Sequence, residues 1–403
     1  MVEQKIIDFV QNNRQAMLTD LEKLVNIYSG TFMPEGTSKV SRVFGDMLRV
    51  LGAEVNFRAA EKFGNHLIAR IGPTGGEKVF VVGHLDTVFE GENNWKFSTE
   101  GDHAYGPGVI DMKSGALIFI WALKAMQEVG TLNKEYVILL NTDEEPGSPD
   151  SRTFIGEIAT GCDYALVMEP AEPGGEILNG RKGVGIFHFM VHGVSAHAGQ
   201  EPEKGASAIR VAADLIQEVS NVAKPEIGTT INVGTISGGS AIYAVPAECQ
   251  LGVDVRVATP KEAERVEAEF TKIAERASKD RITTQVDGEF HRPPMAPNEH
   301  VDELVRRYQA AAKKAGLSIS AKVSGAASDG NTLAGLGFTV IDGLGPVGGR
   351  AHSPEEYLEI ESYFDRTAIL SIMLSELASV GDICPLTNSV TPFSTRRELM
   401  NKT

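Results

Sequence analysis

The sequence predicts an α/β protein, in which a mixed sheet flanked by helices forms one domain and a smaller α+β domain is inserted into it. Short apolar runs alternate with helix-like segments up to about residue 180, as in sheets that helices cover. The pattern then changes to strands with alternating apolar and polar residues. A chain of 403 residues, 42% of them hydrophobic, is long enough for two domains.

The first domain is expected to begin with a helix, because apolar residues recur at three- and four-residue spacings from Ile6 to Leu24. Four apolar runs typical of buried strands follow, and a helical segment at residues 114–130 separates the second run from the third. These runs are HLIARIG (66–72), KVFVVGHLD (78–86), EYVILLNTDEE (135–145) and DYALVMEP (163–170). A helix at 299–315 and the run GFTVIDGLGP (337–346) are expected to rejoin this sheet.

The inserted domain is expected at residues 181–295, which leaves 1–180 and 296–403 for the first domain. Strand-like alternation marks GVGIFHFMVHG (183–193), TTINVGTISGG (229–239) and AECQLGVDVRVA (247–258). Amphipathic stretches at 205–222 and 260–278 give a β-α-β-β-α order, which is typical of an α+β module. Residues 384–403 show little periodicity and are expected to form a poorly ordered tail.

Composition narrows the class of protein. A formal net charge of −16 would repel the phosphates of a nucleic acid. No stretch approaches the roughly 18 apolar residues that a membrane span needs. Three widely spaced cysteines fit a reducing compartment better than a disulfide framework, and the first residues carry no long apolar signal segment. We therefore expect a cytoplasmic protein that binds neither nucleic acid nor membrane.

Polar residues follow three of the apolar runs at their carboxyl ends. His84 and Asp86 follow one run, Asp143–Glu145 the next and Glu169 the third. In α/β sheets, ligands collect beyond the carboxyl ends of the strands. On an extended strand, residues two apart point to the same side, so His84 and Asp86 are expected to face one spot.

Two further motifs add candidate ligands for a metal. GPGVIDMKSGA places Asp111 before a helix, where it alone could be an N-cap, and GGRAHSPEEYL carries a histidine that alone would be a surface residue. Taken together, the candidates are His84, Asp111, Glu145, Glu169 and His352. Imidazole and carboxylate ligands suit Zn²⁺, and also Mn²⁺ or Co²⁺, and one carboxylate can bridge two such ions about 3.5–4 Å apart. Glu144 would then take a proton from the attacking water, and Asp86 would orient His84.

With these residues assembled, the chain resembles the M20 metallopeptidase family, and within it the bacterial glutamate carboxypeptidases. The motifs GHLDTV, YGPGVIDMKSG, NTDEEPGS, MEP, VSAHAG and AHSPEEYL follow the order and spacing of that family. The resemblance implies a di-zinc catalytic domain with an inserted lid domain that usually dimerises. It implies that Asp111 bridges the ions and that Glu144 is the general base. His84 and Glu169 would complete one ion site, and Glu145 and His352 the other. It also implies a cis peptide bond after Asp111.

The resemblance assigns roles to three residues of the inserted domain as well. His197 matches a lid histidine that donates to the oxyanion in an active site, and we expect it to act across a homodimer. Arg256 matches the arginine that holds the free carboxylate of the substrate, and Asn232 an asparagine near the same carboxylate. The alternatives are a surface histidine in a turn for His197 and a salt bridge on an edge strand for Arg256.

The predicted function is metal-dependent hydrolysis of the amide bond to a C-terminal amino acid, in a small N-acyl amino acid or peptide. One alternative is a deacylase of the acetylornithine or succinyl-diaminopimelate type, and another is a metal-binding protein without turnover. Tyr243 stands where relatives often carry Asn, and Arg181 and Lys182 form a basic pair that the glutamate carboxypeptidases lack. The released residue is therefore open between glutamate, another acidic residue and an aromatic residue.

Overall fold

The computed structural model describes residues 1–91 and 94–376, and these residues form two compact units. The first unit contains Met1–Gly180, Pro297–Ser324 and the described part of the segment that begins at Ser328. The second unit contains Arg181–Ala296 together with Gly325–Ala327. The tail expected at 384–403 lies outside the described residues.

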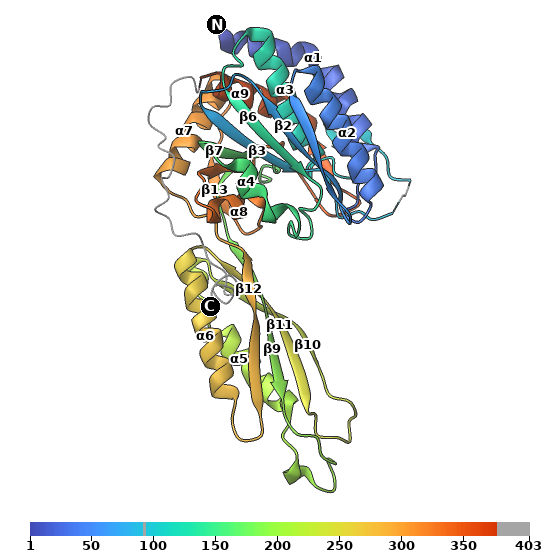
Figure 1. The fold of residues 1–403 in the computed structure, drawn as a ribbon, viewed down its shortest axis with the longest axis vertical. Coiled ribbons are helices and arrows are strands. Elements are labelled where there is room, and N and C mark those ends of the chain that lie inside the picture. The colour runs from blue at the N-terminus through green and yellow to red at the C-terminus, as the bar shows by residue number, and fades with distance from the viewer. Residues whose placement is uncertain (92–93, 377–403) are drawn as a thin grey trace. The chain divides into compact units, whose positions relative to one another are not determined.

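The first unit is built around a six-stranded mixed sheet, as the sequence predicts (Figure 1). The strands β6, β3, β7 and β14 run parallel, whereas β1, β2 and β6 pair antiparallel. Every residue of β6 is buried, and so are six of the seven of β3, because both faces of the sheet are covered. In sheet order the strands are β1 (Glu54–Ala60), β2 (Gly64–Ile71), β6 (Glu135–Asn141), β3 (Lys78–His84), β7 (Tyr164–Val167) and β14 (Val340–Ile341).

Seven α-helices of the first unit surround this sheet. Those that open and close the described chain pack against each other and against the helix that follows Asp111 (Figure 1). The seven are α1 (Val2–Val25), α2 (Pro34–Val50), α3 (Lys113–Val129), α4 (Ile155–Ala159), α7 (Glu299–Lys314), α8 (Asp329–Gly335) and α9 (Ile360–Glu376). Two small sheets complete the unit. They contain β15 (Gly348–Gly349), β16 (Tyr357–Glu359), β5 (His103–Tyr105) and β4 (Ser98–Glu100), and β13 (Ala321–Ser324) with β8 (Ile177–Arg181).

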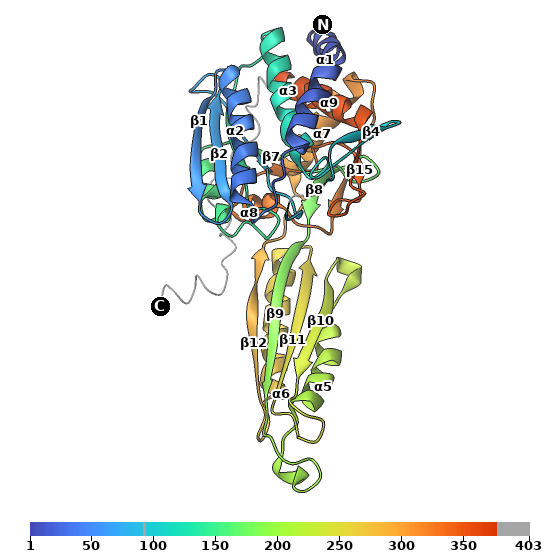
Figure 2. The same cartoon turned by 90° about the vertical axis from the view of Figure 1, so that its right-hand side faces the viewer.

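The second unit is a four-stranded antiparallel sheet with two helices on one face (Figure 2). Its mainly aliphatic core contains an aromatic cluster, in which Phe187 and Phe189 of the sheet pack against Phe270 of a helix, and Phe187 also packs against Phe290. Alternate residues of the strands leave that core and form an open face. In sheet order the strands are β10 (Thr230–Gly238), β11 (Glu248–Val257), β9 (Gly183–His192) and β12 (Thr283–Arg292), and the helices are α5 (Ala208–Ser220) and α6 (Pro260–Ala277). The strand β12 is an addition to the predicted β-α-β-β-α order.

The helices of the second unit begin where their sequences indicate. The side chains of Ser207 and Thr259 accept hydrogen bonds from the backbone N–H groups of Arg210 and Glu262. None of the helices within the described ranges combines the length and the apolar character that crossing a membrane requires.

Candidate metal centre

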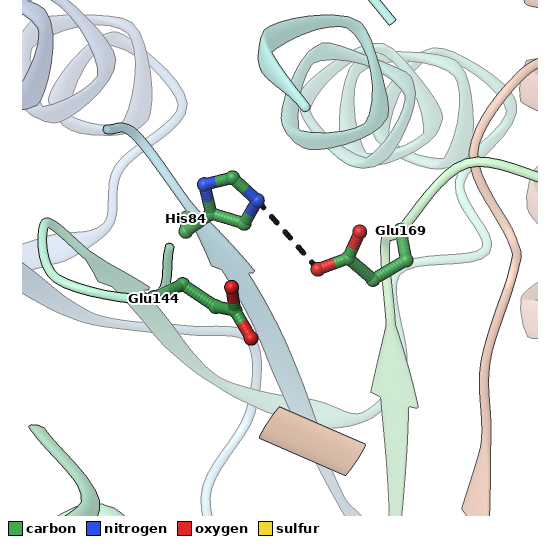
Figure 3. Close-up of side chains that lie close together, drawn as sticks. All are labelled: His84, Glu144 and Glu169. Atoms are coloured by element: carbon green, nitrogen blue, oxygen red, sulfur yellow. Dashed lines mark ion pairs between the residues drawn. The ribbon is translucent and has the colours of Figure 1, made fainter. Parts of the chain in front are cut away.

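The candidate ligands come from the carboxyl edge of the parallel strands and from two nearby loops. His84 is the last residue of β3, and Glu169 lies two residues beyond β7. Glu145 lies in the turn after β6, Asp111 in the turn before α3, and His352 in the loop between β15 and β16. Figure 3 shows His84, Glu144 and Glu169 converging from the ends of three neighbouring strands. Parallel strands share one carboxyl edge, which is why residues far apart in sequence meet here.

The distances between the candidate ligands place Asp111 at the middle. Its Oδ1 lies 3.0 Å from Nε2 of His84, and its Oδ2 lies 3.3 Å from Nε2 of His352. Nε2 of His84 is also 3.6 Å from Oε1 of Glu169, and Nε2 of His352 is 3.2 Å from Oε2 of Glu145. Asp111 thus offers one oxygen to each histidine and its carboxylate partner. This is the arrangement that a carboxylate shared by two cations requires.

The backbone around Asp111 has the expected unusual conformation. The Asp111–Met112 peptide bond is cis, as the resemblance implied. Gly108, in the same turn, has a φ of +72°, a left-handed conformation that favours glycine. A Cβ at Gly108 would lie 2.7 Å from the Cγ2 of Thr87, so the turn has no room for a side chain there.

Asp86 makes more contacts than the sequence indicated. Nδ1 of His84 lies 3.0 Å from the backbone oxygen of Asp86 and 3.4 Å from its Oδ1. The carboxylate also accepts hydrogen bonds from the backbone N–H groups of Glu144, at 3.2 Å, and Glu145, at 3.3 Å. The hydroxyl of Thr31 donates to it at 2.8 Å. Asp86 therefore contacts both the imidazole and the turn that carries two neighbouring acids.

Two overlapping groups of residues have ligand atoms close enough to hold a cation. In one group, ligand atoms of His84, Glu144 and Glu169 lie within 4.8 Å of one another, and in the other those of His84, Asp111 and Glu145 do. Glu144 thus lies near enough either to contact a cation or to contact a water beside one.

The electrostatics of the cluster favour positive charge. Hydrogen bonds with Asp111 and Glu145 raise the pKa of His352 to about 10, and burial raises the pKa of Glu145. The shift of His352 favours a positive charge beside the carboxylates, whereas the shift of Glu145 favours its neutral form, because burial disfavours the charged form. Divalent cations supply the same charge, and two imidazoles with three carboxylates are the donors that Zn²⁺, Mn²⁺ and Co²⁺ accept. The residues therefore fit a dinuclear centre.

Comparison with known proteins agrees with this geometry. Residues 80–376 match peptidase family M20/M25/M40. The chain belongs to this family. It is 31% identical to carboxypeptidase G2 of Pseudomonas sp. (strain RS-16) over 379 residues, which cover 91% of each chain. It is 29% identical to acetylornithine deacetylase of Proteus mirabilis over 211 residues, 47% of this chain and 52% of the relative. The family therefore makes this protein a metallopeptidase or amidohydrolase.

Solved structures show the same fold. Aminopeptidase PepT from Bacillus cereus superimposes with a TM-score of 0.80 at 22% identity, covering 91% of this chain and 99% of its own. YxeP of Bacillus subtilis, a dinuclear metal-binding peptidase from the M20 family, superimposes with a TM-score of 0.68 at 14% identity, over 91% and 99% of the two chains. YxeP is thus a family member that binds a dinuclear metal, and this chain carries candidate ligand groups for a metal.

Three residues singled out in the sequence belong to the second unit of this M20 protein. Nδ1 of His197 accepts hydrogen bonds from the backbone N–H groups of Gly199 and Gln200, at 3.2 and 3.1 Å. An Nδ1 that accepts must carry its lone pair there, so the proton of the neutral ring is on Nε2. The exposed His197 ring is therefore a donor through Nε2.

The other two residues share the open face of the sheet. Nε and Nη2 of Arg256 each donate to Asp254, at 3.0 Å, and Asn232 is the register partner of Asp254 on β10. A salt bridge was one expectation for Arg256, but it was expected on an edge strand. β11 instead lies between β10 and β9. Asp254 occupies one edge of the guanidinium, and a second pair of N–H groups points elsewhere.

Sequence reasoning missed a buried polar network that contacts the end of β6 and the turn that follows it. The carboxylate of Asp329 accepts hydrogen bonds from the side chains of Asn141, at the end of β6, and Ser148, in the turn after Glu145. Ser328 and Asn331 form a capping box at the start of α8. The sequence ASDGN (327–331) carries that helix-start signal and could have pointed to this network.

A second missed residue is Glu356, the acid two positions before the end of the AHSPEEYL motif. Only 1% of its surface is exposed. Burial and the neighbouring Asp111 raise the pKa of Glu356 to about 8, while hydrogen bonds from backbone N–H groups oppose that shift. No signal in the sequence separates Glu356 from the exposed Glu355 beside it.

Proposed function

We propose that this protein is a di-zinc carboxypeptidase-like amidohydrolase, which cleaves the amide bond to a C-terminal amino acid in a small N-acyl amino acid or peptide. One observation carries the proposal: Asp111 offers its two oxygens to His84 and His352, with Glu144 in the same cluster. The match to carboxypeptidase G2 over 91% of the chain supports the same activity. The first unit would be the catalytic domain, and the second the inserted lid.

In the proposed reaction, each residue has a separate task. His84, Asp111 and Glu169 would hold one cation, and Asp111, Glu145 and His352 the other. When bound, the two cations would polarise the substrate carbonyl and make a water more acidic. Glu144 takes the proton of that water and passes it to the leaving amine. Nε2–H of His197 donates to the oxyanion of the tetrahedral intermediate.

The number of bound cations tests the ligand assignments. We expect Zn²⁺ added to metal-free protein to bind with a stoichiometry of two per chain. His352→Ala should lower the stoichiometry to one, because it removes a nitrogen ligand from one group and leaves His84, Asp111 and Glu169 in place. Isothermal titration calorimetry measures both values, with His300→Ala, on α7, as the matched histidine control. Two ions in His352→Ala, or fewer than two in the wild type, would contradict the assignment.

Substrate recognition is proposed to depend on Arg256, with Asn232 beside it. The end of a guanidinium can hold a carboxylate through two parallel hydrogen bonds. We expect Arg256→Ala to lower kcat/KM at least about tenfold for substrates with a free carboxylate, since a charged hydrogen bond contributes roughly 1.5–3 kcal/mol. The corresponding amides or esters should lose little activity.

The control for Arg256 is Arg276→Ala. Arg276 is an exposed arginine of α6 that pairs with Glu218 on the helical side of the same unit. Steady-state kinetics on matched acids and amides, measured for both variants, separate recognition from folding. Equal losses of kcat/KM on acids and amides would show that Arg256 has only a structural role, through its salt bridge with Asp254.

A deacylase of the acetylornithine type is the second candidate function. The similarity to acetylornithine deacetylase, which covers about half of each chain, favours including it. A panel of dipeptides, N-acyl glutamate, N-acyl aromatic amino acids, acetylornithine and succinyl-diaminopimelate, tested on zinc-loaded protein, distinguishes the two. Highest activity on acetylornithine or succinyl-diaminopimelate would replace the carboxypeptidase proposal. Absence of turnover on every substrate would favour a metal-binding protein.

The second unit is proposed to form a homodimer. Large apolar side chains are exposed on one part of it, around α5 and the edge strand β10. They are Val194, Ile209, Ile236, Ile242 and Tyr243. An unpaired strand edge beside exposed apolar residues is typical of a surface that pairs with another chain. The proposed partner is a second copy of this chain.

A further inference from the structure

Glu356 holds the turn that presents Asp111. Its Oε1 accepts hydrogen bonds from the backbone N–H groups of Ile110, at 2.9 Å, and Asp111, at 3.2 Å. Its Oε2 accepts from the N–H of Gly108, at 3.4 Å. Three N–H groups of one turn thus donate to one side chain, and only 1% of the surface of that residue is exposed. Buried N–H groups without an acceptor would cost free energy, so this turn depends on Glu356.

The backbone of Glu356 belongs to the loop that presents His352. Its N–H donates to the backbone oxygen of Ser353 at 3.0 Å, and the N–H of Ser353 donates to the oxygen of Arg350 at 3.1 Å. His352 itself has a φ of +65° within these turns. Directly after Glu356, β16 pairs with β15 and with β5, which fixes the loop at its base. One residue therefore joins the turn of Asp111 to the loop of His352.

We propose that Glu356 is a positioning residue that sets the separation of Asp111 from His352, and thereby the affinity for the cation shared by Asp111, Glu145 and His352. This inference rests on the proposed dinuclear centre. Residues that orient metal ligands without touching the metal typically change metal affinity by about 10–100-fold when they are replaced. The other cation would be held by His84, Asp111 and Glu169. Two of these ligands, His84 and Glu169, lie at strand ends that Glu356 does not contact, so this site should be less affected.

Glu356→Gln tests this role without changing the size of the side chain. Its amide has one acceptor oxygen and one NH₂ group, whereas N–H donors face both oxygens of Glu356. Whichever way the amide of Gln is oriented, its NH₂ group faces at least one backbone N–H donor of the turn. We expect the first equivalent of Zn²⁺ to bind as in the wild type, and the second to bind about 10–100-fold more weakly. Excess Zn²⁺ should restore kcat, with KM unchanged.

Competition with a chromophoric chelator measures the two dissociation constants, and Glu355→Gln is the control because Glu355 is the exposed neighbour. Thermal unfolding of the metal-free proteins reports the fold. If Glu356→Gln does not fold, Glu356→Asp, which withdraws the carboxyl group by one methylene, is measured instead and should weaken the second equivalent in the same way. Two constants equal to those of the wild type, or equal weakening of both, would overturn the inference.

The same measurements separate this inference from the proposed function. A wild-type protein that binds two cations but cleaves no substrate of the panel would refute the proposed function, while the chelator competition still decides the role of Glu356. A wild-type protein that binds fewer than two cations would overturn both.

Discussion

Replacing Glu144 by glutamine is expected to leave two bound cations per chain and to lower kcat by about 10²–10⁴. The change keeps the size of the side chain and removes its ability to take a proton. In the proposed reaction, that proton comes from the attacking water and later reaches the leaving amine. The expected result is therefore a protein with the wild-type metal content and little turnover.

Measuring the metal content is what makes this variant informative. Ligand atoms of Glu144 lie within the same 4.8 Å group as those of His84 and Glu169, so Glu144 could itself be a ligand (Figure 3). If Glu144 is a ligand, the Glu144→Gln variant should lose a cation along with its activity. If Glu144 is only the base, the variant should lose activity and keep both cations.

Glu145→Gln is the matched control, because it changes the adjacent acid of the same turn. Glu145 contacts His352 at 3.2 Å and is a proposed ligand, so this variant should bind one cation less tightly. Metal analysis should therefore distinguish the two variants: Glu144→Gln keeps two cations while its turnover falls, whereas Glu145→Gln binds one cation less tightly. Loss of a cation from Glu144→Gln, or turnover near that of the wild type, would refute the assignment of Glu144 as base.

The sheet and the strand-end residues could be predicted because their sequence signals are local. β3 and β6 are continuous apolar runs that end in polar residues, and such runs indicate strands buried on both faces. Parallel strands then place those ends at one edge, where His84, Glu144 and Glu169 converge. Asp111 and His352 could be predicted only together with the other motifs, since neither follows a strand run. Taken alone, Asp111 could be a helix N-cap and His352 a surface residue.

Elements without periodicity were missed for physical reasons. α9 is buried on nearly all sides, so it has no polar stripe to mark a helix. β12 is an edge strand with a mostly half-exposed or exposed sequence, and it carries Gly288, so its alternation is weak. Asp329 and Glu356 act through long-range hydrogen bonds to Ser148 and to the Asp111 turn, which no local pattern encodes.

A heterodimer that combines two inactive variant chains is expected to regain activity if His197 acts across the proposed dimer. His197→Ala should lower kcat by about 10²–10³, the usual cost of losing one oxyanion donor. The hydrogen bonds that Gly199 and Gln200 donate to Nδ1 leave Nε2–H as the donor of the exposed ring. His197 is exposed, and it belongs to the same unit as the exposed apolar residues around β10. A residue that enters the active site of a partner chain would need both properties.

The complementation test combines Glu144→Gln with His197→Ala. Each homodimer should be nearly inactive, because every site lacks either the base or the donor. In the heterodimer, one site combines the intact Glu144 of the His197→Ala chain with the intact His197 of its partner, so about half of the wild-type activity per dimer should return. If His197 instead served its own chain, both sites of the heterodimer would remain defective.

Mixing Glu144→Gln with His192→Ala provides the matched control, since His192 is an exposed histidine of β9 in the same unit. His192→Ala alone should be active, and its heterodimer with Glu144→Gln should have the activity of the one site with an intact base. Differently tagged chains, purified in two affinity steps, verify that heterodimers have formed before kcat is measured. No recovery in verified heterodimers of Glu144→Gln with His197→Ala, or full activity in a monomer, would rule out action across the dimer.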